Sequence, residues 1–148
     1  MTSVPQKQSI FTISEFAELH TDGAGYDILR HLCLPELLGD ESSSILYFMG
    51  RNLARKIDIN SMEEIVSAFD VFGWGKLELV KEKRKELVFQ LMSDAVVRRL
   101  ESPFDTEFRL EAGFLAEAVQ TMKQTDCECT ETTNRRIGQI EFSVIYTD

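Results

Sequence analysis

The stretch DTEFRLEAGFLAEAVQTMKQTDCECTETTNRRIGQIEFSVIY, residues 105–146, predicts a long helix followed by a pair of strands, and the rest of the expected fold is arranged around these elements. Its first half carries apolar residues at alternating steps of four and three, which form one stripe of an α-helix: Phe108, Ala112, Leu115, Val119 and Met122. Three further apolar residues widen the stripe: Leu110, Phe114 and Ala118. We therefore expect other elements to cover this helix on more than one side.

The charged residues of this helix are expected to face solvent: Glu107, Arg109, Glu111, Glu117 and Lys123. Pro103 precedes the helix, and Asp105 or Thr106 can cap its first turn. Gly113 lies in the middle of the helix, where glycine costs roughly 1 kcal/mol relative to alanine. It indicates the close approach of another backbone or of a ligand, or else it is a tolerated small residue.

The second half of the stretch has the period of β-strands. Apolar side chains alternate with others at Ile140, Phe142, Val144 and Tyr146, as in a strand with one buried face. Cys127, Cys129 and Glu131 share a face of the preceding strand, and Asn134–Gly138 is the expected turn. A second hairpin is expected at Leu77–Val80 and Leu87–Met92, with the charged residues Lys81–Lys85 as its turn.

The residues before these hairpins favour helices. Asp40–Ser44 opens one that runs to Ile57 and contains Gly50, and Ser61–Glu64 is a capping box that opens the next. We interpret Ser42–Ser44 as capping residues and not as nucleophiles. The expected fold class is α+β, with helices packed on one face of a four-stranded antiparallel sheet made of two hairpins. Residues 1–148 form a single domain, with the core at 40–146.

Residues 10–39 form an N-terminal helical segment with much apolar surface. Asp22–Gly25 is expected to be a flexible joint, Pro35 to interrupt a short helix and Gly39 to end it. The apolar side chains Phe16, Ile28, Leu29 and Leu32 need a partner, either the rest of the domain or a second copy of the chain.

Composition excludes several function classes. Sixteen basic and 25 acidic residues give a net charge of −9, which disfavours nucleic acid and anionic lipid as partners. No apolar run is long enough for membrane insertion, and the N-terminus has no signal-peptide core, so we expect a cytoplasmic protein.

The three cysteines are expected to be reduced. A zinc site made of Cys33, Cys127, Cys129 and His20 or His31 lacks the usual ligand spacings, so we expect inert core thiols, no metal and no cofactor. The tripeptide Gly73-Trp74-Gly75 covers the mouth of a pocket or forms a packed corner.

The order of elements and the residues at their joints resemble the 4-vinyl reductase domain and the TRAPP vesicle-tethering subunits. The resemblance covers about residues 40–146 and rests on Tyr47–Gly50, Ser61–Glu64, Phe72–Glu78, Glu111–Leu115 and Cys129, Glu131, Gly138 and Phe142–Val144. The whole chain looks like a YslB-like family of small uncharacterised bacterial proteins. This resemblance implies a fold that dimerises through its N-terminal helices, and a hydrophobic ligand held between helices and sheet. The axial histidine of the related haem sensors and the acylated cysteine of the TRAPP subunits have no counterpart here.

We therefore expect a non-catalytic binding or assembly module, a homodimer that holds a small apolar ligand or a protein partner. Its expected ligand-binding residues are Phe48, Gly50, Trp74, Gly113 and Phe114, and its expected dimer interface contains Phe16, Ile28, Leu29 and Leu32. One alternative is a purely structural protein–protein interaction subunit without a ligand. The other is an enzyme in which two of Glu111, Glu128, Glu131 and Glu141 meet as acid and base.

Overall fold

The computed structural model describes residues 12–16, 23–101 and 106–148, and it has the expected α+β architecture. Four strands form one antiparallel sheet in the order β1-β2-β4-β3, with bounds Lys76–Glu82, Glu86–Met92, Cys127–Asn134 and Gln139–Tyr146 for β1 to β4. Each hairpin pairs within itself, and β2 joins them by pairing with β4. The predicted sheet of two hairpins is confirmed.

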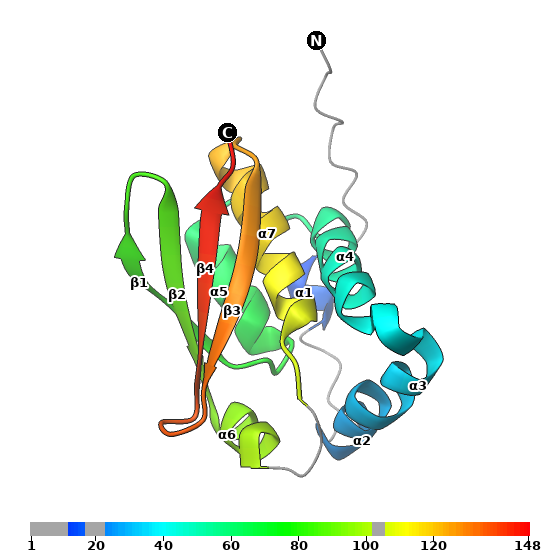
Figure 1. Ribbon diagram of the computed structural model, residues 1–148. Coiled ribbons are helices and arrows are strands. Elements are labelled where there is room, and N and C mark those ends of the chain that lie inside the picture. The colour runs from blue at the N-terminus through cyan, green and yellow to red at the C-terminus, as the bar shows by residue number, and fades with distance from the viewer. Residues whose placement is uncertain (1–11, 17–22, 102–105) are drawn as a thin grey trace.

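The helices form layers on one side of this sheet (Figure 1). The helices α5 (Met62–Val71) and α7 (Arg109–Lys123) lie nearest the sheet, and α4 (Ser42–Arg55) packs on the far side of α7. Helix α6 (Asp94–Glu101) follows β2. A short helix, α1 (Ile13–Phe16), lies near α5.

The segment Gly23–Leu38, which we call the arm, precedes α4. It consists of α2 (Gly23–Ile28), the π-helical turn η1 (Leu29–Cys33) and α3 (Leu34–Leu38), and the 3-10 turn η2 (Gly39–Glu41) connects it to α4. The expected joint is wrong in its described part, because Gly23 begins a helix. Pro35 does not interrupt a helix; it lies in the first turn of α3, where its missing N–H has no intrahelical role. Gly39 ends α3 as expected.

Helix starts confirm one sequence expectation and correct two. Ser61 Oγ accepts the N–H of Glu64 at 3.2 Å, so the predicted cap of α5 is confirmed. The N-cap of α4 is Glu41 without a side-chain bond, so the serines are not caps. The N-cap of α7 is Phe108, and Glu107 Oε2, not Thr106, accepts the N–H of Arg109, at 2.7 Å; Asp105 lies outside the described residues.

The sheet and α4 together enclose α7, and every residue from Glu111 to Val119 is buried. The expectation that the charged residues of this helix face solvent is therefore wrong for Glu111, which is 0% exposed, and for Glu117, which is 6% exposed. The wider apolar stripe had indicated that a second layer covers this helix, and both glutamates lie beneath that layer.

Helices α4 and α7 meet through their backbones. A Cβ atom added to Gly50 would lie 2.1 Å from the carbonyl oxygen of Leu110, and one added to Gly113 would lie 1.9 Å from that of Tyr47. Each helix thus supplies a glycine and a carbonyl three residues earlier, and no side chain can occupy the contact. Of the interpretations left open for Gly113, backbone approach is the one the structure shows.

We expect Gly113→Ala and Gly50→Ala each to lower the free energy of unfolding by at least about 2 kcal/mol, because the helices must separate to admit the methyl group. Urea denaturation followed by circular dichroism measures this change. Alanine normally stabilises a helix relative to glycine by about 1 kcal/mol. A loss of stability on either substitution would therefore indicate that the contact between the helices has no room for the methyl group. Ser44→Ala, at an exposed position of α4, is the matched control and should change stability by less than about 0.5 kcal/mol.

Candidate functional site

None of the five residues expected to bind a ligand lines either of the two hollows that the structure describes near α6. Phe48 is 57% exposed on α4, whereas Phe114 is fully buried in α7. Gly50 and Gly113 fill the α4–α7 contact. The structure therefore brings four of the five together, around α7, but as packing, and it leaves Phe48 on the surface.

Trp74 forms a packed corner. Its ring makes edge-to-face contacts with three phenylalanines, at centroid distances of 5.1 Å to Phe69, 5.0 Å to Phe72 and 5.3 Å to Phe114. Only 4% of the residue is exposed. Of the two interpretations of this tripeptide, the packed corner holds for the ring, while its two glycines border an open cleft.

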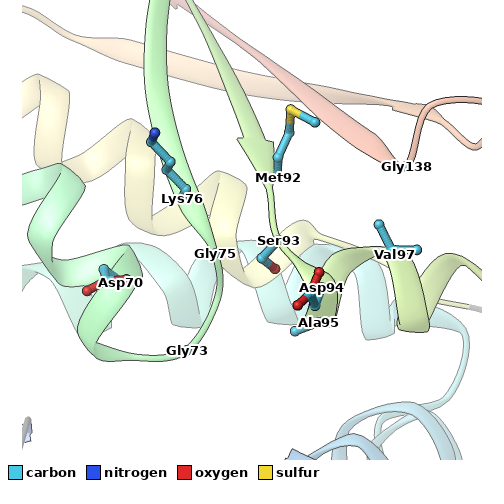
Figure 2. Close-up of a pocket in the computed structure, with 10 residues that line it drawn as sticks. All are labelled: Asp70, Gly73, Gly75, Lys76, Met92, Ser93, Asp94, Ala95, Val97 and Gly138. Carbon is cyan, nitrogen blue, oxygen red and sulfur yellow. The ribbon is translucent and has the colours of Figure 1, made fainter.

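That cleft, with a volume of about 660 Å³, lies between the start of β1, the end of β2 and the start of α6 (Figure 2). Its lining contains the apolar side chains of Met92 and Val97 and the charged side chains of Asp70, Asp94 and Lys76. Ser93 Oγ accepts the N–H of Val96 at 3.0 Å, so the hydroxyl is used to cap α6. The cleft is wide and open to solvent, and it does not enclose a ligand in the manner of a small-molecule pocket.

The arm presents an apolar outer surface. Ile28, Leu29 and Leu32 are 50%, 55% and 43% exposed, and Leu37 of the same segment is 79% exposed. Phe48 and Met49 of the following helix are also more than half exposed. Three of the four residues expected at the dimer interface are thus available to a partner, and the side chain of the fourth, Phe16, lies outside the described residues.

The inner surface of the arm is held by a buried arginine. Arg30 is 3% exposed, and all five of its N–H groups donate hydrogen bonds. Two go to the Glu111 carboxylate, at 2.7 Å and 2.5 Å. The others go to Glu107 Oε1 at 2.8 Å, to the Glu107 carbonyl at 3.2 Å and to Tyr26 Oη at 2.8 Å. Burial alone would lower the pKa of Arg30, yet the Glu111 carboxylate raises it well above its usual value.

The π-helical turn explains how two neighbouring polar residues reach the interior. It runs from Leu29 to Cys33, and both Arg30 and His31 are buried. The wider turn changes the direction in which successive side chains point, and such turns are frequent at functional positions. Arg99 of α6 completes the group by donating from Nε to Asp27 Oδ1 at 3.0 Å.

A second ionic group joins α4 to the edge strand β3. Arg51 donates to Glu117 Oε1 and Glu128 Oε1, both at 3.0 Å, and to the carbonyl of Cys127. Tyr47 Oη donates to Glu128 Oε2 at 2.5 Å and accepts the N–H of Cys129 at 3.0 Å. Burial and the bond to Glu128 raise the pKa of Tyr47 to about 12. These bonds occupy backbone groups at one end of an exposed sheet edge.

The four glutamates considered as acid and base do not converge. Glu111 is bound by Arg30, Glu128 by Arg51, and Glu131 by Arg109 at 2.6 Å. Glu141 pairs in the sheet between Gln90 and Thr132 and is exposed. Burial raises the pKa of Glu131 and outweighs the positive charge of Arg109. Each of the first three carboxylates is thus held by a guanidinium, which suits a structural role.

The sequence reasoning missed Arg30, Arg51 and the burial of their glutamates, although a signal existed. Glu111 lies three residues after Phe108 and four before Leu115, within the apolar stripe. Glu117 lies three residues after Phe114, within the wider stripe. A glutamate inside an apolar stripe predicts a buried partner of opposite charge, although periodicity does not identify which arginine it is.

The thiols differ in accessibility. Cys127 and Cys129 are buried on β3, whereas Cys33 is exposed on the arm, and all three are free. Burial raises the pKa of Cys127 to about 11 and that of Cys129 well above its usual value. Within the described residues, no group of three or more metal-ligating side chains forms.

We expect one thiol per chain to react with a maleimide in the native protein at pH 7, and three after denaturation, because burial keeps Cys127 and Cys129 both inaccessible and protonated. Mass spectrometry of the labelled protein counts the adducts. Cys33→Ser should abolish native labelling. Fast labelling of the native Cys33→Ser protein would contradict the burial of the strand thiols.

Comparisons with known proteins agree with this fold. A family model described as "Protein of unknown function (DUF2507)" matches residues 23–145. The uncharacterized protein YslB of Bacillus subtilis is 35% identical over 133 residues, which cover 90% of each chain. The uncharacterized protein MJ1642 of Methanocaldococcus jannaschii is 22% identical over 114 residues, which cover 76% of this chain and 69% of that one.

A solved structure shares the fold. The crystal structure of a vinyl-4-reductase family protein from Methanocaldococcus jannaschii superposes with a TM-score of 0.65 and 17% sequence identity, over 92% of this chain and 88% of that one. The resemblance to the 4-vinyl reductase domain is thereby confirmed at the level of the fold. Every helix of the described residues is too short or too polar to cross a lipid bilayer.

Proposed function

The chain belongs to the DUF2507 family, and we propose that it is a non-catalytic assembly module that forms a homodimer through the outer surface of its arm. The observation that carries this proposal is the exposure of Ile28, Leu29, Leu32 and Leu37 on one short segment. Exposed apolar surface costs free energy in water, and a contiguous patch of it is typical of an interaction site.

The arrangement of the arm supports a partner beyond its own domain. An amphipathic segment ordinarily turns its apolar side to the core and its charged side to water. Here Asp27 and Arg30 point inward to ion pairs, and the leucines point outward. A second copy of the chain would give those leucines an apolar surface to bury.

The packing around α7 supports a protein partner over a small apolar ligand. The expected ligand site is filled, because helix backbones meet at Gly50 and Gly113 and aromatic rings enclose Trp74. A ligand would instead have to use the open cleft beside Gly73, which has few enclosing walls. The ion pairs of Glu111, Glu128 and Glu131 likewise favour a module without catalysis.

We expect the double variant Leu29→Glu, Leu32→Glu to be a folded monomer where the unaltered chain is a dimer, because four carboxylates at a two-fold interface would face an apolar surface and one another. Native mass spectrometry and analytical ultracentrifugation measure the oligomer, and circular dichroism checks the fold. The same native mass spectrum reports any bound small molecule as mass in excess of the 16.9 kDa chains.

The matched control is Ile145→Glu, which places a charge at another exposed apolar residue, on a strand of the sheet. It should leave the dimer intact. A wild-type chain that stays monomeric at concentrations of tens of micromolar would refute the homodimer, and pull-down experiments would then be aimed at a different protein bound by the arm.

A further inference from the structure

The inner side of the arm is an ionic contact with a histidine in it. Arg30 binds Glu107 and Glu111 at the start of α7, and Asp27 binds Arg99 of α6. The Tyr26 ring stacks with both guanidiniums, with its centroid 5.9 Å from Arg30 Cζ and 5.3 Å from Arg99 Cζ. These ion pairs attach the arm to the core, whereas Ile28, Leu29, Leu32 and Leu37 are 43% to 79% exposed.

His31 lies in this contact as a buried imidazole. Its side chain is 1% exposed, and neither ring nitrogen has a hydrogen-bond partner among the residues that the structure describes. The carboxylate oxygen Asp27 Oδ1 is 3.9 Å from Nε2, which is beyond hydrogen-bond distance. The imidazole thus occupies a place that suits an uncharged ring.

The charges around His31 come from the arm itself, from α6 and from the start of α7. Arg30 and Asp27 belong to the arm, Arg99 to α6, Glu107 precedes α7 and Glu111 lies within it. Burial, and next the charge of Arg30, lower the pKa of His31, and Glu107 and Asp27 oppose them without reversing the direction. A protonated His31 would be a third buried cation beside two guanidiniums, and it would lack a hydrogen-bonded partner.

We propose that the arm is a pH-sensitive latch, which rests on the core while His31 is neutral and leaves it when His31 is protonated. In the released arm the imidazole is solvated and binds a proton more readily than in the docked arm. The docked state is therefore fully favoured above the pKa of free histidine, about 6.5, and loses stability as the pH falls below it.

A carboxylate of the same contact acts in the same direction at lower pH. Burial would raise the pKa of Glu107, but the charge and hydrogen bond of Arg30, together with the hydrogen bond from the Arg109 N–H, outweigh it and lower this pKa below its usual value. Protonation of Glu107 removes a bond to Arg30, so it weakens the latch only after His31 has titrated. The inference does not depend on the homodimer, since the contact lies within one chain.

Hydrogen-exchange mass spectrometry of the full chain, from pH 7.5 to pH 5.5, tests the latch. After correction for intrinsic exchange rates, peptides covering residues 23–38 should exchange faster as the pH falls, by no more than about tenfold per pH unit for one proton. Peptides of α7 and of the sheet should keep their protection. The oligomeric state is a separate question. A dimer that persists at pH 5.5, or a monomer at pH 7.5, tests the homodimer proposal, and the arm peptides can still be compared with those of α7 and the sheet.

Variants separate His31 from other titrating groups. His31→Phe should keep the arm docked at pH 7.5 and remove the acceleration down to pH 5.5, whereas His20→Gln, which removes the other histidine, should retain it. Glu111→Gln should release the arm at every pH. Acceleration that persists in His31→Phe, or its absence in the unaltered chain, overturns the proposal. If His31→Phe does not fold, an NMR titration of the native imidazole decides, since a pKa at or above that of free histidine is incompatible with the latch.

Discussion

The backbones of α4 and α7 touch each other, and this close contact sets where the neighbouring elements can pack. Two glycines, Gly50 and Gly113, let each helix touch a carbonyl of the other. Because no side chain separates the helices, α4 covers the side of α7 that the sheet leaves open. The central helix is consequently enclosed over two turns, and everything it carries there must find its partners inside the protein.

Enclosure has its largest consequence for the two glutamates of α7. A carboxylate without water needs a cation and hydrogen bonds, and each glutamate obtains them from a distant part of the chain. Arg30, 81 residues earlier, binds Glu111, and Arg51, 66 residues earlier, binds Glu117. Replacing either pair by apolar residues could stabilise the fold, so the pairs are better understood as setting the positions of the arm and of α4 relative to α7.

The same requirement shapes the surface of the protein. The arm must turn its arginine inward to satisfy Glu111, and as a result Leu29, Leu32 and Leu37 point outward. Tyr47 and Arg51 of α4 bond to backbone groups at the start of β3, which protects this end of the sheet edge from pairing with another chain. The arm thereby becomes the surface best suited to assembly, and the attachment of that surface to the core is electrostatic.

Elements whose signals are local could be predicted from the amino-acid sequence. Alternation marked the strands of both hairpins, a period of four and three marked α7, and Ser61 marked the start of α5, because each pattern reports which face of one element is apolar. Local patterns also identified Ile28, Leu29 and Leu32 as apolar side chains that need a partner, and in the fold the domain itself leaves all three exposed.

The number of layers over each element, and the residues that meet across them, depend on the packing of the whole chain. Glu107, Glu111 and Glu117 look alike in sequence, yet the packing of α4 and the arm leaves the first partly exposed and buries the other two. Trp74 and Gly113 could equally have lined a cavity, and the approach of α4 and of three phenylalanines turned both into packing. Periodicity along one chain segment carries no information about the second surface that closes on it, and this is why the buried ion pairs and the latch histidine emerged only from the fold.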